Sequence, residues 1–155
     1  MSKTKKLIIG GDSLFAEVAY ELFTKDSEYE VVAFTVEKSY HKKNELFNLP
    51  IIPFEDIDEI YNPDDYYFYA AIVYTELNRL RTRLYKKAKE KGFKIASYIS
   101  SNAFVWSNSN LGEHCFIFEN NVIQPFTTLG NNVVLWSGNH IGHHSIINDN
   151  VFISS

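Results

Sequence analysis

The second part of the chain, from Ile99 to Ser155, repeats a pattern of hydrophobic positions with a period of six residues. A branched aliphatic residue occupies the first recurring position of every hexad, namely Ile99, Val105, Leu111, Ile117, Ile123, Leu129, Leu135, Ile141, Ile147 and Ile153. The residue four places later is always small or β-branched, namely Ala103, Ser109, Cys115, Asn121, Thr127, Val133, Asn139, Ser145 and Val151. This pattern is typical of a β-helix, in which each hexad forms one side of a coil and stacked coils bury a continuous core.

Ordinary alternating strands are the other interpretation, but they would lose a six-residue register after two or three elements. Three hexads make one coil, so residues eighteen apart should lie above one another at about 4.8 Å. The segment then holds about three coils, close to the lower limit for a stable solenoid. Because the pattern runs to Ser155 without a polar cap, we expect a chain truncated within the repeat.

The first hundred residues show a different pattern, in which short apolar runs alternate with helical periodicity. Strands are predicted at Lys6–Ile9, Glu30–Val36, Tyr66–Val73 and Phe93–Tyr98, with a further extended piece at Leu49–Phe54. A helix is predicted after the first strand from the helical spacing of Phe15 to Phe23, a short helix is predicted through Ile57 and Ile60 after Pro53, and a third helix is predicted over Leu77–Glu90. Such alternation favours a small parallel sheet. We therefore predict a Rossmann-like α/β domain over 1–98, followed by a left-handed parallel β-helix over 99–155.

Composition limits the functional classes. The formal net charge is -4, whereas binding to nucleic acid or to an anionic membrane surface usually requires a basic face. The single cysteine, Cys115, excludes an internal disulfide framework and a cysteine zinc cage, and its inward position predicts a core residue. No apolar run approaches the ~18 residues of a membrane span, and the N-terminus leads directly into a strand. We expect a cytoplasmic protein.

The first strand is followed by Gly10, Gly11, Asp12 and Ser13 and then by a helix. Glycines allow backbone amides to approach a ligand closely, and a helix N-terminus attracts phosphate. The same turn could serve only strand–helix packing. Glu37 follows the second strand, at the edge where open α/β sheets bind ligands, so it is a candidate contact to a ribose or base; a surface carboxylate is the alternative.

Three histidines, His140, His143 and His144, form the densest group of titratable residues. Because Ile141 and Ser145 occupy the inward register, the three imidazoles should point away from the coil core, where they could transfer protons. Two other interpretations remain, namely polar fillers on the coil surface and a metal site shared between subunits. No carboxylate stands at a spacing typical of a metal site, so we predict none.

These motifs together resemble a known family. Lys6–Glu21, Lys91–Ile95 and the hexads around Ile141–His144 are similar to sugar acyltransferases of the sialic acid O-acetyltransferase and bacillosamine-pathway N-acetyltransferase type. The resemblance implies that the first domain binds the nucleotide of a nucleotide-linked sugar. It also implies a homotrimer in which acetyl-CoA lies between adjacent β-helices.

The resemblance further implies that His143 is the catalytic base. His144 stands where relatives often carry a glutamate that orients the base, so His140 is a rival for either role. The resulting prediction is an acetyl-CoA-dependent transferase that acetylates an amino or hydroxyl group of a nucleotide-linked sugar, for surface polysaccharide or glycan synthesis. The alternative is a non-catalytic module that binds a nucleotide sugar or trimerises. Outward-facing aromatic residues, Phe116, Phe118, Phe126, Trp136 and Phe152, are predicted to form the trimer surface.

Overall fold

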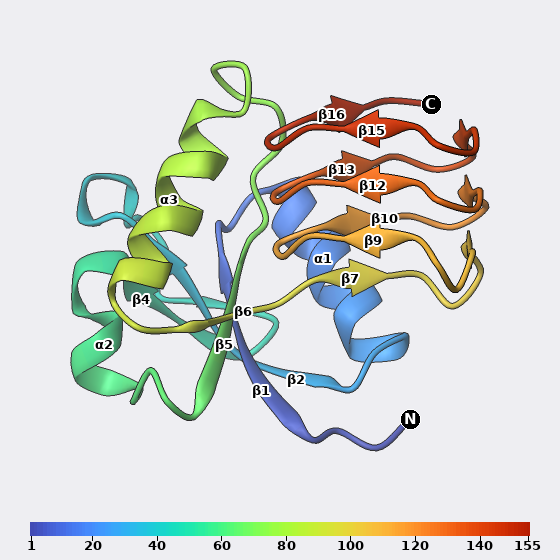
Figure 1. Cartoon of the computed structure of the whole chain (residues 1–155). Helices are drawn as coiled ribbons and strands as arrows, with labels where there is room; N and C mark the ends of the chain where they lie inside the picture. The colour runs from blue at the N-terminus through green and yellow to red at the C-terminus, as the bar shows by residue number, and fades with distance from the viewer. The chain divides into compact units, whose positions relative to one another are not determined.

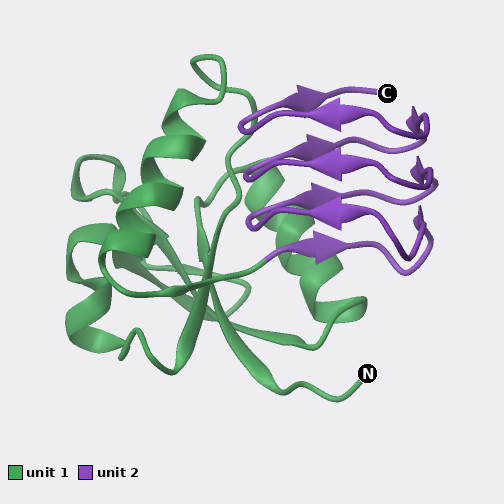
Figure 2. Cartoon of the chain, in the orientation of Figure 1, with its two compact units in different colours: residues 1–96 green, residues 97–155 purple.

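The computed structural model describes all residues from Met1 to Ser155. The chain divides into two compact units, Met1–Ala96 and Ser97–Ser155, which Figure 2 shows in green and purple. No helix in the structure is both long enough and apolar enough to cross a membrane.

The first unit is built on a six-stranded sheet with the order β3-β4-β2-β1-β5-β6. The strands are β1 (Lys5–Gly10), β2 (Tyr29–Val36), β3 (Glu45–Leu46), β4 (Leu49–Pro53), β5 (Tyr66–Ala70) and β6 (Lys94–Ile95). All neighbouring pairs are parallel except β3 with β4, which form an antiparallel hairpin. The predicted parallel α/β sheet is therefore confirmed.

Helices cover both faces of this sheet (Figure 1). Helix α1 (Leu14–Lys25) lies on one face, and α2 (Ile57–Ile60) and α3 (Arg79–Glu90) lie on the other. Two 3-10 turns, η1 (Lys38–Tyr40) and η2 (Phe54–Asp56), follow the ends of β2 and β4. Apolar strand residues and the buried stripe of α3 form the core between sheet and helix; its fully or almost fully buried members are Ile8, Ala33, Phe54, Ile57, Phe68, Ala70, Leu84, Ala88 and Phe93.

Three elements are shorter than the sequence predicts. Strand β5, predicted over Tyr66–Val73, ends at Ala70. Helix α3 begins at Arg79 and not at Leu77, because Glu76, Leu77 and Asn78 all have left-handed φ angles of 52° to 67°. The strand predicted over Phe93–Tyr98 contains only Lys94–Ile95, since Tyr98 pairs within the coils of the second unit.

The second unit consists of stacked coils, each with three two-residue strands. The strands are β7 (Tyr98–Ile99), β8 (Phe104–Val105), β9 (Asn110–Leu111), β10 (Phe116–Ile117), β11 (Val122–Ile123), β12 (Thr128–Leu129), β13 (Val134–Leu135), β14 (His140–Ile141), β15 (Ile146–Ile147) and β16 (Phe152–Ile153). They form three parallel sheets, β16-β13-β10-β7, β14-β11-β8 and β15-β12-β9. Every paired residue is eighteen positions from its partner, as with Phe116 and Val134. The hexad pattern therefore predicted the stacking register correctly.

The two recurring positions line the interior of the coils. Cys115, Ile117, Ile123, Leu129, Val133, Leu135 and Ile141 are buried there, with Ala103, Val105, Leu111, Ile147, Val151 and Ile153 packed against them. Ile99, in the first strand, is 41% exposed and lies outside this core. Inward polar residues are satisfied by turn carbonyls: the Asn121 amide donates to the carbonyl oxygens of Phe118 and Trp136, at 2.9 and 2.8 Å.

The corners of the coils share one backbone conformation. Positions 114, 120, 126, 132, 138, 144 and 150 all have φ between 58° and 79°, and only position 138 is glycine. This left-handed residue precedes each small inward position from Cys115 to Val151 and turns the chain from one flat side to the next. The six-residue repeat therefore applies to a left-handed backbone conformation as well as to the type of side chain.

The predicted outward aromatic surface is wrong in part. Phe116 is fully buried and Phe118 is 5% exposed. Their rings lie in a row of neighbours on one side of the coils, with centroid distances of 4.7 Å from Tyr98 to Phe116, 4.9 Å from Phe116 to Phe118 and 4.3 Å from Phe118 to Trp136. Phe126 is 59% exposed, so it does face outward.

Candidate functional site

The glycine turn follows β1 in a conformation that requires glycine at one position. Gly11 has φ of 113°, and a Cβ added there would lie 2.9 Å from the carbonyl oxygen of Ala71. Its backbone N–H donates to the carbonyl oxygen of Thr35 at 2.8 Å, which ties the turn to the end of β2. Gly10 is also closely packed, since its Cβ would lie 2.7 Å from the Phe68 ring.

Helix α1 starts directly after this turn, with Ser13 as its N-cap residue. The Ser13 side chain makes no capping hydrogen bond. The first-turn N–H groups of a helix have no intrahelical partner, and with the helix dipole they favour an anion. The turn and helix start can therefore hold a phosphate group through backbone atoms.

A cavity of about 340 Å³ lies at the carboxyl ends of β1 and β2 in the first unit. It brings together four of the residues singled out from the sequence, Gly11, Asp12, Ser13 and Glu37, whereas Gly10 does not line it. The other lining residues are Thr35, Val36, Tyr40, Ile72, Thr75, Glu76, Leu80 and Leu84. Its apolar wall comes from α3 and the end of β5, and its polar wall from the turns after β1 and β2.

Glu37 is held in place by α3. Arg83 donates from Nη1 to Oε2 at 2.7 Å and from Nη2 to Oε1 at 2.8 Å, in a two-pronged ion pair. Lys87 lies 4.0 Å from the same carboxylate. The hydrogen bonds from Arg83 lower the pKa of Glu37, so the carboxylate stays ionised and can accept further hydrogen bonds. Arg83 was not predicted from the sequence, although it lies three residues after Leu80 and four before Lys87 and therefore shares one side of α3 with them.

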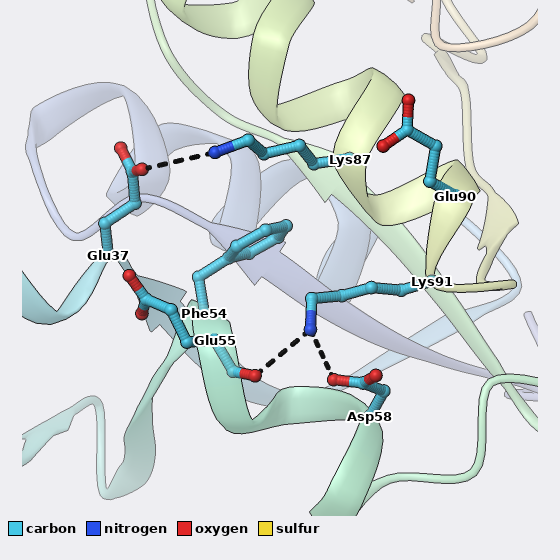
Figure 3. Close-up of a pocket in the computed structure, with 7 residues that line it drawn as sticks. All are labelled: Glu37, Phe54, Glu55, Asp58, Lys87, Glu90 and Lys91. Atoms are coloured by element: carbon cyan, nitrogen blue, oxygen red, sulfur yellow. Dashed lines mark hydrogen bonds and ion pairs between the residues drawn. The ribbon is translucent and has the colours of Figure 1, made fainter.

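A second cavity of about 440 Å³ lies beside Glu37, where Phe54, Glu55, Asp58 and residues of α3 meet (Figure 3). Four of its six charged side chains pair with one another: Lys91 donates to Asp58, and Lys87 points toward Glu37. Lys91 also donates to the backbone carbonyl of Glu55. The Phe54 ring is 4% exposed and belongs to the core. This cavity is lined mainly by surface charges that are already paired within the protein.

The three histidines lie on the outside of the coils. His140 is on β14, and His143 and His144 are in the turn that follows; all three side chains are exposed. The Nδ1 atoms of His143 and His144 are 3.0 Å apart, with ring planes at 89°. His140 does not take part in this contact.

Phe126 supports the pair from the coil below. Its ring stacks on His144 with centroids 4.7 Å apart and planes at 26°. Both residues occupy the same coil corner, eighteen positions apart, with φ of 62° and 60°. The eighteen-residue spacing places Phe126 beside His144, whereas the sequence pattern was interpreted only as placing Phe126 on a trimer surface.

The other reactive side chains of the second unit are buried. Cys115 is 0% exposed in the coil core, as predicted. His114, which was not predicted as a site residue, is also 0% exposed, and its Nδ1 lies 2.8 Å from Oδ1 of Asn132. No group of three or more His, Cys, Asp or Glu residues is arranged to hold a metal ion.

Comparison with known proteins identifies the fold. No protein-family model and no curated protein matches the chain. Among solved structures, the acetyltransferase domain of PglB from Neisseria gonorrhoeae matches with a TM-score of 0.82 and 20% identity, over 97% of this chain and 71% of that one. The same domain in complex with acetyl coenzyme A matches with a TM-score of 0.80 and 19% identity, over 96% of this chain and 69% of that one. PerB from Caulobacter crescentus, in complex with CoA and GDP-perosamine, matches with a TM-score of 0.69 and 19% identity, over 93% of this chain and 63% of that one.

These likenesses extend over both units of the chain. The fold is therefore that of the structures compared, in which a parallel α/β sheet precedes a parallel β-helix.

Proposed function

We propose that the protein is an acetyl-CoA-dependent acetyltransferase that acts on an amino or hydroxyl group of a nucleotide-linked sugar. The observation that carries the proposal is the match of both units to acetyltransferase structures, two of which hold acetyl-CoA or CoA and one of which holds a nucleotide sugar. Two features of this chain support it independently, namely the cavity at the glycine turn and the exposed histidine pair.

In this proposal the first unit is a Rossmann-like domain that binds the nucleotide. The strand order β4-β2-β1-β5-β6 and the cavity at the carboxyl ends of β1 and β2 agree with ligand binding where open parallel sheets usually bind. Backbone amides near Gly11 and the start of α1 would hold the phosphates. Asp12, Ser13 and Glu37 line the same cavity and would contact the rest of the nucleotide.

The second unit, proposed to be a left-handed β-helix, supplies the base. His143 accepts a proton from the sugar amine or hydroxyl while that group attacks the thioester carbonyl of acetyl-CoA. The C–S bond then breaks, and the proton passes from the imidazolium to the leaving CoA thiolate. General-base catalysis of this kind contributes about 10²- to 10⁴-fold to the rate. Direct transfer needs no enzyme nucleophile, which is consistent with the burial of Cys115.

A homotrimer completes the proposal, with acetyl-CoA bound between adjacent β-helices. Large apolar side chains remain exposed on the coils, notably Phe104, Trp106, Phe126 and Ile146 at 51%, 44%, 59% and 75%. Exposed apolar patches of this kind commonly mark protein interfaces. We place the enzyme in the cytoplasm, in the synthesis of surface polysaccharide or glycan.

The proposal is tested with a thiol-release assay across amino-sugar and hydroxy-sugar nucleotides, in the presence of acetyl-CoA. Release of CoA that depends on one sugar nucleotide is the expected result. Calorimetry with each ligand separates the alternative, because a non-catalytic module would bind the sugar nucleotide but not CoA. Binding of neither ligand would contradict both functions.

A further inference from the structure

Thr35, near the end of β2, has a buried hydroxyl group without a hydrogen-bond partner. The residue is 1% exposed, and its Oγ1 atom makes no hydrogen bond within the protein. Buried polar side-chain atoms are paired in the large majority of cases, so each exception calls for an explanation. Thr35 lines the 340 Å³ cavity that also contains Gly11 and Glu37, and a ligand in this cavity is a natural partner for the hydroxyl.

The charges around Thr35 indicate which part of a ligand fits. The lining includes the carboxylates of Asp12, Glu37 and Glu76 and no lysine or arginine. Around Thr35, away from the backbone amides of the turn, these carboxylates favour neutral groups that donate hydrogen bonds. Arg83 keeps Glu37 ionised by lowering its pKa, so the neighbour of Thr35 is a permanent acceptor near neutral pH. A sugar hydroxyl is the group that suits both side chains.

The closeness of Thr35 to the proposed phosphate site indicates that the hydroxyl belongs to the ribose of the nucleotide. The Thr35 carbonyl oxygen accepts a hydrogen bond from the Gly11 N–H, and both residues line the same cavity, so Thr35 lies next to the turn proposed to hold the phosphates. In a nucleotide the ribose is joined directly to the phosphate, whereas the base is one group further away. We propose that the Thr35 hydroxyl exchanges a hydrogen bond with a ribose hydroxyl of the bound nucleotide, and so selects ribonucleotides. This inference rests on the nucleotide-binding part of the proposed function.

The test compares Thr35→Val with Thr35→Ser and the unchanged protein. Valine has the same shape and the same preference for strands, so it removes only the hydroxyl. Without ligand, Thr35→Val should be at least as stable as the unchanged protein in thermal unfolding, because no internal hydrogen bond is lost. A hydroxyl with a structural role would instead give a lower Tm.

Affinity is measured by calorimetry with GDP and UDP and with their 2'-deoxy and 3'-deoxy forms. For the nucleotide that binds best, we expect Thr35→Val to weaken binding of the ribonucleotide about tenfold, the usual effect of one lost hydrogen bond. Thr35→Ser should retain most of the affinity. Removal of one ribose hydroxyl should weaken binding to the unchanged protein by a similar factor and have no further effect on Thr35→Val.

Three outcomes would overturn the inference. Equal affinity of Thr35→Val and the unchanged protein would exclude the contact while leaving the proposed function intact. A loss in Thr35→Val that is the same for ribose and deoxyribose ligands would place the contact on the base. Failure of the unchanged protein to bind any of the nucleotides would reject this inference together with nucleotide binding in the proposed function.

Discussion

The Nδ1 atoms of His143 and His144 face one another at 3.0 Å, and this contact links the tautomers of the two rings. A hydrogen bond between two imidazole nitrogens requires a proton on one of them and a lone pair on the other. Because stacking on Phe126 fixes the ring of His144, the pair is held by the coil and not only by its own hydrogen bond. The tautomers of the two histidines are therefore coupled.

The first prediction assigns these tautomers. A base must present an unprotonated nitrogen to the substrate, so we expect His143 to carry its proton on Nδ1 and donate it to Nδ1 of His144, leaving Nε2 free. Long-range ¹H–¹⁵N spectra at about pH 8.5, where imidazoles are neutral, report the tautomer directly. In His144→Ala, His143 should lose its preference for the Nδ1–H form. Phe126→Ala should reduce that preference, and His140→Ala should leave it unchanged.

The opposite tautomers, with His143 protonated on Nε2, would contradict this arrangement. They would make His143 a proton donor to the substrate and His144 the acceptor of the substrate's proton.

The second prediction concerns catalysis. His143→Ala should lower kcat by about 10²- to 10⁴-fold and change sugar-nucleotide affinity only a few fold, because a general base acts mainly in the transition state. His144→Ala should lower kcat less, since this substitution removes only the contact that orients the ring of His143. Steady-state kinetics together with calorimetry separates the two effects.

If His143→Ala is nearly fully active and His140→Ala is inactive, the assignment of the base is wrong. If both variants are active, the histidine cluster is structural and the mechanism fails.

The sequence predicted the β-helix well because every coil repeats the same pattern and so gives independent evidence for the same register. Each coil repeats the same apolar, small and corner positions, so one register explains ten strands. The exposure of the outward side chains was harder to predict. Alternation separates inward from outward positions, but it does not show which outward positions are covered by other residues. Phe116 and Phe126 both point away from the core, yet Phe116 is buried and Phe126 is exposed.

The candidate site followed from local signals only where the chain itself brings residues together. Asp12 and Ser13 adjoin Gly11, and Glu37 ends the neighbouring strand, so parallel pairing collects them. Arg83 is forty-six positions from Glu37, and no short-range pattern links the two. The unpaired hydroxyl of Thr35 is a property of packing, which a sequence does not display.

The third prediction concerns assembly. Phe104 and Trp106 lie on one side of the coils with ring centroids 5.8 Å apart, and both are exposed. We expect light scattering to give the mass of three chains at micromolar concentration, and Trp106→Glu to shift that mass toward one chain. Ile60→Glu changes an exposed apolar residue of the first unit and is the control. A monomeric unchanged protein would contradict the prediction.

The fourth prediction concerns the ion pair of Glu37 and Arg83. Because the hydrogen bonds from Arg83 lower the pKa of Glu37 in the folded state, the unfolded state binds this proton more tightly. The stabilisation is therefore fully present above the ordinary value of 4.5 and is lost as the pH falls through the folded pKa. Glu37→Gln should cost about 1 kcal/mol at pH 7.

Urea unfolding of the two proteins between about pH 3 and pH 7 measures the effect, and the difference should shrink at the acid end. Glu30→Gln is the matched control, because Glu30 is an exposed carboxylate of β2, the strand that Glu37 follows. A difference that stays constant over this range would mean that Glu37 acts through packing and not through its charge.

The last prediction compares two glycines with positive φ. Gly11 has φ of 113°, and an added Cβ would meet the carbonyl oxygen of Ala71 at 2.9 Å. Gly138 has φ of 79° at a coil corner, and nothing lies within 4 Å of its added Cβ. The equivalent corners hold non-glycine residues such as Asn120 and Asn132 at φ of 60° and 58°. Steric contact, and not the sign of φ alone, should therefore separate the two sites.

We expect Gly11→Ala to lower stability by about 1 to 3 kcal/mol, since the side chain strains the turn against a backbone atom that cannot move freely. Gly138→Asn should change stability by less than about 1 kcal/mol, because asparagine tolerates the left-handed region and has space there. Urea unfolding of both variants checks these values. Equal losses would show that φ alone governs both positions, and a stable Gly11→Ala with unchanged nucleotide affinity would remove the glycine turn from the proposed binding site.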